Sequence, residues 1–260
     1  PQQRNGVKFI DIFCGAGGSS IGLSEAGFEL LLGANHWPTA IDTHSANFPD
    51  AEHLCADVNN YDMRYLPRGA DVLWASPICT EISPSGGRTR VKRGPDGAPD
   101  LVQELGHVSQ KGMTRTRATF FDVLRATEVW RFKVVIVENV PDAVSWELFD
   151  IWLSGMERLG YRYKLVSVNT AHIGGDGIPY GPQWRDRLYI VFVRRDIGRL
   201  PELQPRPLAR CFVCERDVRG VQTWAPATQG RKFLVGRYRR QPDSSYGQYW
   251  YRCPNAGCGN

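Results

Sequence analysis

The sequence predicts an α/β fold in which helices cover both faces of a mostly parallel β-sheet, followed by a small second domain. Two observations predict it. Over the first 200 residues, short β-rich apolar runs alternate with stretches whose apolar residues recur at helical spacing. Three prolines within residues 200–207 then indicate a linker, and beyond it the chain is rich in Arg, Cys and aromatic residues. We therefore expect one domain over residues 1–200 and the start of a second over 201–260.

The composition is that of an ordinary globular protein. Hydrophobic residues make up 42% and charged residues 23% of the 260 residues. The apolar runs are far shorter than the roughly 20 residues that span a bilayer. The first residue is Pro1, and no signal-peptide pattern follows it. These features exclude a membrane protein and a disordered one, and we expect a cytoplasmic chain.

Strands and helices are expected to alternate along the first domain. Continuous β-rich runs predict buried parallel strands at residues 7–13, 28–34, 71–75 and 133–137, with a short strand before Asp57. Helical spacing predicts helices at 38–48, 120–130 and 146–159, and Ser19 or Ser20 can cap a helix that reaches Ala26. Residues 161–168 alternate instead, and 188–194 form a second β-rich run, which predicts an antiparallel pair at the edge of a sheet of about seven strands.

The turn after the first expected strand is rich in glycine. With Gly15, Gly17 and Gly18, it allows backbone N–H groups at a helix N-terminus to approach a ligand closely. His36 follows the second strand and can hydrogen-bond a hydroxyl group, and Asp57 can accept a hydrogen bond from an adenine amino group. Two alternatives stay open, a glycine turn used only for tight packing and an aspartate that caps a turn.

Cys79 lies just past the strand at 71–75, at the sheet edge where open α/β folds place their sites. A thiol there is either a nucleophile or a small buried hydrophobe. A long segment with seven basic residues follows it, among them Arg88 and Arg90, and resembles a lid over a polyanionic substrate. Glu138 ends the strand at 133–137, so it reaches the same edge, either to donate a proton to a ring nitrogen or to cap a helix.

Gln183, Arg185 and Arg187 alternate on the approach to the last strand, so we expect all three side chains on one face. Two guanidinium groups on one face indicate a clamp for carbonyl, phosphate or carboxylate groups.

Taken together and in this order, the motifs resemble the cytosine-C5 DNA methyltransferase family. The matching residues are Asp11-Ile-Phe-Cys-Gly-Ala-Gly-Gly18, Cys79, Glu138-Asn139-Val140 and Gln183-x-Arg185-x-Arg187. The resemblance covers about residues 7–195. It implies a class I, Rossmann-like methyltransferase fold that binds S-adenosylmethionine through Phe13, Gly15, Gly17, Gly18, His36, Trp37 and Asp57. It also implies double-stranded DNA as partner, in the cytoplasm at the nucleoid, and a restriction-modification type of enzyme.

The implied reaction is methyl transfer to C5 of a flipped-out cytosine. Cys79 adds to C6, Glu138 protonates or hydrogen-bonds N3, and Arg185 holds the base carbonyl, while Gln183, Arg187, Arg88 and Arg90 contact the substrate. The sequence departs from the family at Ile78, where Pro is usual, and at His36, where Glu is usual. The resemblance also stops before the family's closing segment, so we expect a chain that ends within the target recognition region.

Two other functions stay open. A non-catalytic DNA-binding paralogue could keep the same scaffold, although it would have no reason to retain Cys79, Glu138 and Arg185 together. Methylation of tRNA by the same chemistry is the second alternative.

The second domain carries most of the positive charge. Residues 201–260 hold ten basic and four acidic residues, interleaved with aromatic ones, which suits a nucleic acid but is also compatible with a solvated basic surface. Cys211, Cys214, Cys253 and Cys258 form two short-spaced pairs, which predicts a structural Zn²⁺ site, with disulfides as the alternative. Cys14 and Cys55 have no such spacing and are expected to be packing residues.

Overall fold

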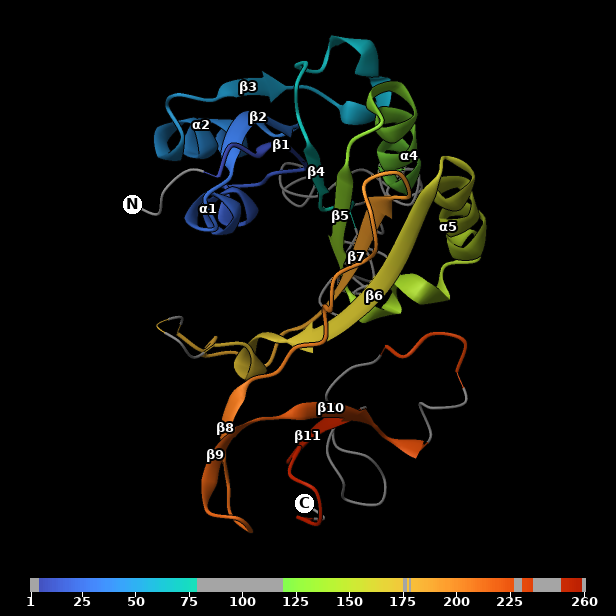
Figure 1. Ribbon diagram of the computed structural model, residues 1–260. Helices are drawn as coiled ribbons and strands as arrows, with labels where there is room; N and C mark the ends of the chain where they lie inside the picture. The colour runs from blue at the N-terminus through green and yellow to red at the C-terminus, as the bar shows by residue number, and fades with distance from the viewer. Residues whose placement is uncertain are drawn as a thin grey trace, which may run out of the picture.

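The chain folds around a seven-stranded mixed sheet (Figure 1). The computed structural model describes residues 5–78, 119–174, 177, 179–226, 231–235 and 249–258. The strand order is β3-β2-β1-β4-β5-β7-β6. The pairs among the first five strands are parallel, whereas β7 is antiparallel to both β5 and β6. The predicted mostly parallel sheet of seven strands and its antiparallel edge are confirmed.

The elements follow one another as strand and helix. The sheet strands are β1 (Lys8–Ile12), β2 (Glu29–Asn35), β3 (Glu52–Cys55), β4 (Val72–Ala75), β5 (Val134–Asn139), β6 (Tyr161–Asn169) and β7 (Asp186–Arg194). The α-helices are α1 (Gly18–Glu25), α2 (Pro38–Asn47), α4 (Thr119–Trp130) and α5 (Phe149–Arg158), and a 3-10 helix at Pro141–Ser145 precedes α5. The helix expected from residue 146 therefore begins three residues later.

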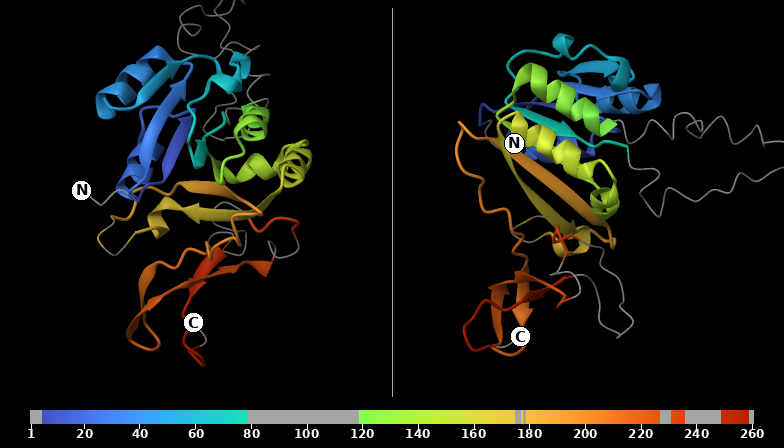
Figure 2. Two further views of the ribbon diagram at one scale, coloured as in Figure 1. Left: turned by 45° about the horizontal axis from the view of Figure 1, so that its top comes forward. Right: turned by 90° about the vertical axis from the view of Figure 1, so that its right-hand side faces the viewer.

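Helices cover both faces of the sheet, as two views show (Figure 2). On one face, α4 and α5 bury the apolar side chains of the central strands, and Phe120, Trp152 and Phe192 are fully buried there. The Trp152 indole also donates a hydrogen bond of 2.7 Å to the backbone oxygen of Phe120. This layer supplies most of the hydrophobic core and therefore fixes the strands whose ends form the site.

The second domain consists of two small antiparallel pairs below the sheet (Figure 1). One pair is β8 (Leu208–Cys211) with β9 (Arg216–Arg219), and the other is β10 (Val221–Trp224) with β11 (Tyr249–Arg252). The preceding residues 201–207 have no regular secondary structure, as expected of a linker. No helix among the described residues is long and apolar enough to cross a membrane.

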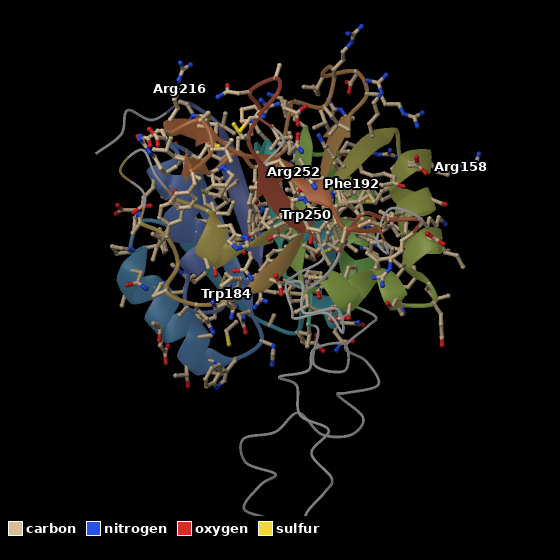
Figure 3. The ribbon with its side chains drawn as sticks, turned by 90° about the horizontal axis from the view of Figure 1, so that it is seen from below. Arg158, Trp184, Phe192, Arg216, Trp250 and Arg252 are labelled. Atoms are coloured by element: carbon tan, nitrogen blue, oxygen red, sulfur yellow. The ribbon has the colours of Figure 1, made fainter. Side chains whose placement is uncertain are left out.

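Aromatic contacts join this domain to the segment before β7. His172 lies edge-on to Trp184, at 5.4 Å between ring centres, and edge-on to Tyr249 of β11, at 5.7 Å. The guanidinium of Arg252 lies 5.4 Å from the centre of the Trp250 ring, and Figure 3 shows both residues from below together with Trp184. The second domain is thus packed against the ends of β6 and β7.

Trp152 provides a test of the core. We expect Trp152→Ala to lower the free energy of unfolding by about 3–5 kcal/mol, because it leaves a cavity and removes the partner of the Phe120 carbonyl. Urea denaturation measures the loss. Ile151→Ala is the matched control. Ile151 is adjacent to Trp152 in the sequence but 61% exposed, so its truncation should change the free energy of unfolding by less than about 0.5 kcal/mol. Equal effects of the two substitutions would contradict this packing.

Candidate active site

The glycine turn between β1 and α1 has an unusual backbone. Phe13, Gly15 and Gly17 all have positive φ, of 65°, 55° and 102°. Phe13 is the costly member, since side chains other than glycine rarely adopt this conformation, and such strain often marks a binding site. A Cβ at Gly15 or Gly18 would meet no atom within 4 Å among the described residues. The turn therefore presents its backbone to open space, as a ligand-binding turn requires.

The first turn of α1 corrects one sequence expectation. The residue that caps α1 is Gly17, and no side chain caps the helix. Ser19 and Ser20 instead lie inside the helix and donate hydrogen bonds of 2.5 and 2.7 Å to the buried Oδ2 of Asp11. Burial raises the pKa of the Asp11 carboxyl to about 7, against the lowering effect of the two serines. The serines thus anchor the helix to β1 rather than terminate it.

The other expected cofactor residues lie at the ends of β2 and β3. His36 and Trp37 follow β2 and are exposed, with 58% of Trp37 accessible. The carboxylate of Asp57 accepts hydrogen bonds from the backbone of Asn59, at 3.1 Å, and the side chain of Asn60, at 2.9 Å. Asp57 is therefore a turn cap, as the alternative interpretation held, but it is exposed and each oxygen can accept a further bond.

The chain leaving β4 is tied to the end of β5. Asn139 donates from its side chain to the backbone oxygen of Pro77, at 3.0 Å, and its own Oδ1 accepts from the backbone N–H of Val140. Asn139 is buried, so both bonds are sheltered from water. They hold residues 76–78 beside Glu138. Cys79, Arg88 and Arg90 lie outside the described residues.

Glu138 forms the central ion pair of this edge. Its Oε1 is 2.6 Å from Nε of Arg187, and both side chains are mostly buried, at 22% and 16% exposure. Burial raises the pKa of Glu138 above its usual value, and the charges of Arg187 and then Arg185 oppose that shift. A carboxyl group in this setting can carry a proton at higher pH than a solvated one.

Of the three residues expected on one face, Gln183 and Arg185 lie before β7, which begins at Asp186, although Arg185 lines a cavity together with Glu138 and Tyr189. Gln183 and Arg185 precede the strand and are exposed, so strand alternation does not apply to them. Arg187, in the strand, is the arginine that pairs with Glu138.

A cavity of about 420 Å³ brings the site together. It is lined by Gly18 and Ser19 of α1, Trp74 and Ser76 at the end of β4, and Glu138, Arg185 and Tyr189. Trp74 and Tyr189 were missed by sequence reasoning. Their contact, 6.0 Å between ring centres, forms one wall, and only the strand register reveals it. A larger hollow of about 880 Å³, between the far ends of α1 and α2, contains no predicted site residue.

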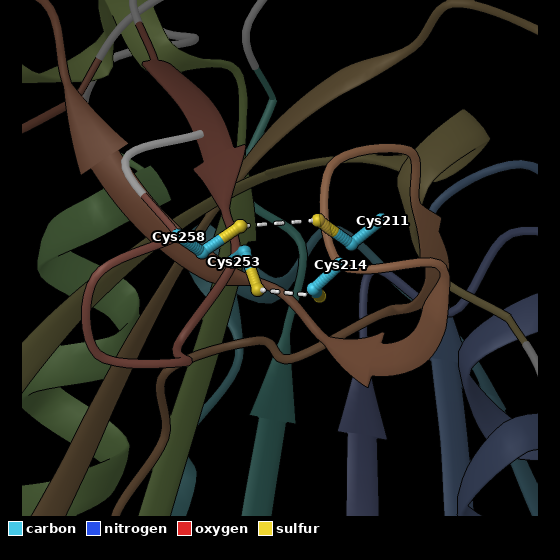
Figure 4. Close-up of side chains that lie close together, drawn as sticks. All are labelled: Cys211, Cys214, Cys253 and Cys258. Atoms are coloured by element: carbon cyan, nitrogen blue, oxygen red, sulfur yellow. Dashed lines mark hydrogen bonds between the residues drawn. The ribbon is translucent and has the colours of Figure 1, made fainter.

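The four cysteines of the second domain meet (Figure 4). Their sulfur atoms all lie within 4.8 Å of one another, with 3.4 Å between Cys211 and Cys258 and 3.7 Å between Cys214 and Cys253. A tetrahedral Zn²⁺ with bonds of about 2.3 Å requires sulfurs about 3.8 Å apart. The donor set and its spacing therefore fit that ion. Of the other two described cysteines, Cys14 is buried, as expected, but Cys55 is exposed.

Comparisons with known proteins show which family the chain resembles. Residues 7–208 match the family model of C-5 cytosine-specific DNA methylases. The chain is 31% identical over 208 residues to the type II methyltransferase M1.HphI of Haemophilus parahaemolyticus, covering 76% of this chain and 49% of the relative. It is 27% identical to M.HhaI of the same organism, covering 79% and 55%. The chain thus spans about half the length of these relatives.

Solved structures show the same fold. A putative DNA modification methyltransferase encoded within an Escherichia coli prophage aligns with a TM-score of 0.53 and 17% identity, over 87% of this chain and 62% of that one. A DNMT2 mutant of Spodoptera frugiperda also aligns with a TM-score of 0.53, at 15% identity, over 75% and 56%. At these identities the likeness concerns the fold alone.

The ion pair at the sheet edge can be tested by titration. We expect Arg187→Ala to raise the pKa of Glu138 further, because the variant loses the nearest positive charge and a hydrogen bond to the carboxylate. NMR titration of the Glu138 side-chain carboxyl measures the change. Arg185→Ala is the control and should raise the pKa less. A larger rise in the control would show that Arg185, rather than Arg187, controls this carboxyl.

Proposed function

Since the chain belongs to the C-5 cytosine-specific DNA methylase family, we propose that it methylates C5 of cytosine in double-stranded DNA, as part of a restriction-modification type of enzyme. The observation that carries the proposal is the grouping of side chains at the edge of the sheet where β4 and β5 end. Gly18 at the end of the glycine turn, Ser76 after β4 and Glu138 line one cavity, and Arg187 pairs with Glu138. The retained acid, its guanidinium partner and Cys79 favour an enzyme over a non-catalytic DNA-binding protein of the same fold.

S-adenosylmethionine fits the turn on chemical grounds. The open space over Gly15 and Gly18 leaves room for a ligand against the backbone, with Phe13 and Gly17 completing the turn. The exposed Trp37 ring can cover an adenine face, His36 can hydrogen-bond a ribose hydroxyl, and Asp57 can accept from the adenine amino group. When bound there, the cofactor supplies an electrophilic methyl group.

Cytosine C5 is a poor nucleophile, so the protein must first activate the ring. The Cys79 thiolate forms a bond to C6 while Glu138 delivers a proton to N3, which converts the ring into an enamine with a nucleophilic C5. After C5 is methylated, a base or water removes the C5 proton and the C6–sulfur bond breaks, which releases Cys79 and returns the N3 proton.

The ring must leave the helix for these groups to reach it, and Glu138 and the guanidinium groups then hold it in place. Burial raises the pKa of Glu138 and thereby favours the proton that N3 requires. Arg185, which lines the cavity, would hold the base carbonyl, and Gln183 and Arg187 would contact the substrate. Arg88 and Arg90 would contact the DNA backbone.

Trapping of a covalent adduct tests the mechanism. Fluorine at C5 blocks removal of the C5 proton, so the protein should form a denaturation-resistant adduct at Cys79 with duplex DNA that contains 5-fluorocytosine. Peptide mapping by mass spectrometry locates the bond. We expect Cys79→Ala to abolish the adduct and Glu138→Gln to slow its formation on the order of 10²- to 10³-fold, as loss of one oriented donor does.

The exposed Cys55 provides the control, because Cys55→Ala should form the adduct at the normal rate. Adduct formation by Cys79→Ala would overturn the mechanism. A preference for tRNA over duplex DNA in the same assay would replace DNA as the substrate.

We further propose that residues 201–260 begin a target recognition domain held together by one structural Zn²⁺. From residue 208 onward, the described hydrophobic side chains that are buried are Cys211, Val235 and Tyr249. So little apolar burial is insufficient to fold a domain of this size without a staple. The four convergent thiols would provide it, and the Asn255 side chain, whose Nδ2 is 3.3 Å from the Cys214 sulfur, would support the ligand.

Metal analysis tests the zinc site. We expect one Zn²⁺ per purified chain by atomic emission, about half that or less in Cys253→Ser, and one in the control Cys55→Ser. Chelation should also lower the melting temperature, because metal binding is coupled to folding of the domain. Well under one equivalent in the unaltered chain, with no effect of chelation, would contradict the proposal.

A further inference from the structure

A row of hydrogen-bonded polar side chains is buried beneath the glycine turn, and the proposed chemistry uses none of them. Asp11, Ser20 and His44 each have 0% exposure. The oxygen of Ser20 lies 2.7 Å from Oδ2 of Asp11 and 3.1 Å from Nε2 of His44. Nδ1 of His44 lies 2.9 Å from Nε2 of His53. Four side chains thus connect β1, α1, α2 and β3.

The direction of these hydrogen bonds follows from the ionised form of Asp11. The single hydroxyl hydrogen of Ser20 then points to the carboxylate, so the Ser20 oxygen accepts from Nε2–H of His44. Burial, and then the charge of His53, lowers the pKa of His44 to about 4, so His44 is neutral near pH 7. Its Nδ1 then accepts from Nε2–H of His53. His44 therefore has one defined tautomer.

Packing locks the same ring in place. A Cβ added to Gly33 of β2 would lie 2.5 Å from Cε1 of His44, and one added to Gly17 would lie 3.2 Å from its Cδ2. Phe48 lies beside the ring, at 4.9 Å between ring centres, and its Cε2 would lie 2.9 Å from a Cβ added to Gly17. The imidazole therefore fills the space that Gly33 leaves and shares with Phe48 the space that Gly17 leaves. One of these glycines is the residue from which α1 starts.

Helix α1 depends strongly on the polar contacts of Ser19 and Ser20 for its position. It has eight residues, and Ser20 is the one that is buried. A helix of this length gains little stability from its own backbone, and here no buried apolar side chain holds it to the sheet. Its orientation therefore rests on the bonds that Ser19 and Ser20 make to Asp11 and on the contact with His44.

We propose that His44 is a positioning residue for the cofactor: by donating to Ser20 and filling the space beside Gly17 and Gly33, it holds the first turn of α1 so that the backbone N–H of Gly18 faces the ligand. The inference rests on the proposed function of the glycine turn and adds a residue of α2 to it. His44 does not touch the ligand and acts through Ser20.

The test compares two substitutions of His44 with one of its partner Ser20. His44→Leu keeps most of the volume but leaves the Ser20 oxygen without its donor, whereas His44→Gln can still place an N–H near the position of Nε2. Isothermal titration calorimetry measures binding of S-adenosylmethionine. We expect the Leu variant to bind about tenfold or more weakly, since a small misplacement is costly, and the Gln variant to recover most of the affinity. Ser20→Ala should weaken binding as the Leu variant does, with no further loss in the double variant.

Ile41→Ala is the matched control, because Ile41 is a buried residue of α2 that takes no part in the hydrogen bonds among Asp11, Ser20, His44 and His53. It should lower the melting temperature without a tenfold loss of affinity. Equal affinity of wild type and His44→Leu would overturn the inference and leave the proposed function intact. The inference also fails if affinity follows melting temperature alone across all variants. Absence of any binding by the wild-type chain would overturn the proposed cofactor site itself, and the inference with it.

A second measurement needs no cofactor. Long-range ¹H–¹⁵N NMR spectra should show that Nε2 of His44 carries the proton and Nδ1 does not. A proton on Nδ1 would reverse the bonds in the row and contradict the proposed link to Ser20.

Discussion

The antiparallel pairing of β5 with β7 is the constraint on which the site depends. In a fully parallel sheet, the first residues of every strand lie at the edge opposite the last ones. Because β7 runs against β5, its beginning lies beside the end of β5, with Glu138 opposite Tyr189 and Asn139 opposite Leu188. Arg187, two residues before Tyr189 on the same face, thereby reaches the Glu138 carboxylate. An acid and a guanidinium group from distant parts of the chain meet through strand direction alone.

The charges at this edge and under the glycine turn are handled in different ways. Glu138 is mostly buried but paired with Arg187, which limits the cost of keeping it ionised while burial favours its protonation. Asp11 has no cationic partner among the described residues; its Oδ2 accepts from two serines, and its buried Oδ1 has no partner there. The first arrangement suits a group that exchanges a proton with a substrate. The second suits a structural anchor for a helix.

Much of the fold could be predicted from the sequence. Apolar runs at 7–13, 71–75 and 133–137 leave little choice but buried strands, and the alternation at 161–168 with the β-rich run at 188–194 indicates an edge pair. Side-chain partners were harder. Ser19 and Ser20 fit the rules for helix caps, but their acceptor is a carboxylate on a neighbouring strand. Arg185 and Arg187 look equivalent until the first residue of β7 is known. The cysteine cluster was predictable, because two short-spaced pairs bring thiols together in few ways.

The second domain depends on contacts in two directions. Inside it, four sulfurs lie close together where hydrophobic burial is sparse. Outside it, Tyr249 is fully buried and its hydroxyl oxygen lies 3.2 Å from Nδ1 of His172, while the Gln222 side chain donates to the backbone oxygen of Ser167 in β6. These contacts are to β6 and the segment that follows it, and β6 pairs with β7, the strand that carries Arg187. The contacts of the second domain and the Glu138–Arg187 pair are therefore joined through one pair of strands, which would link the proposed recognition of DNA to the proposed acid.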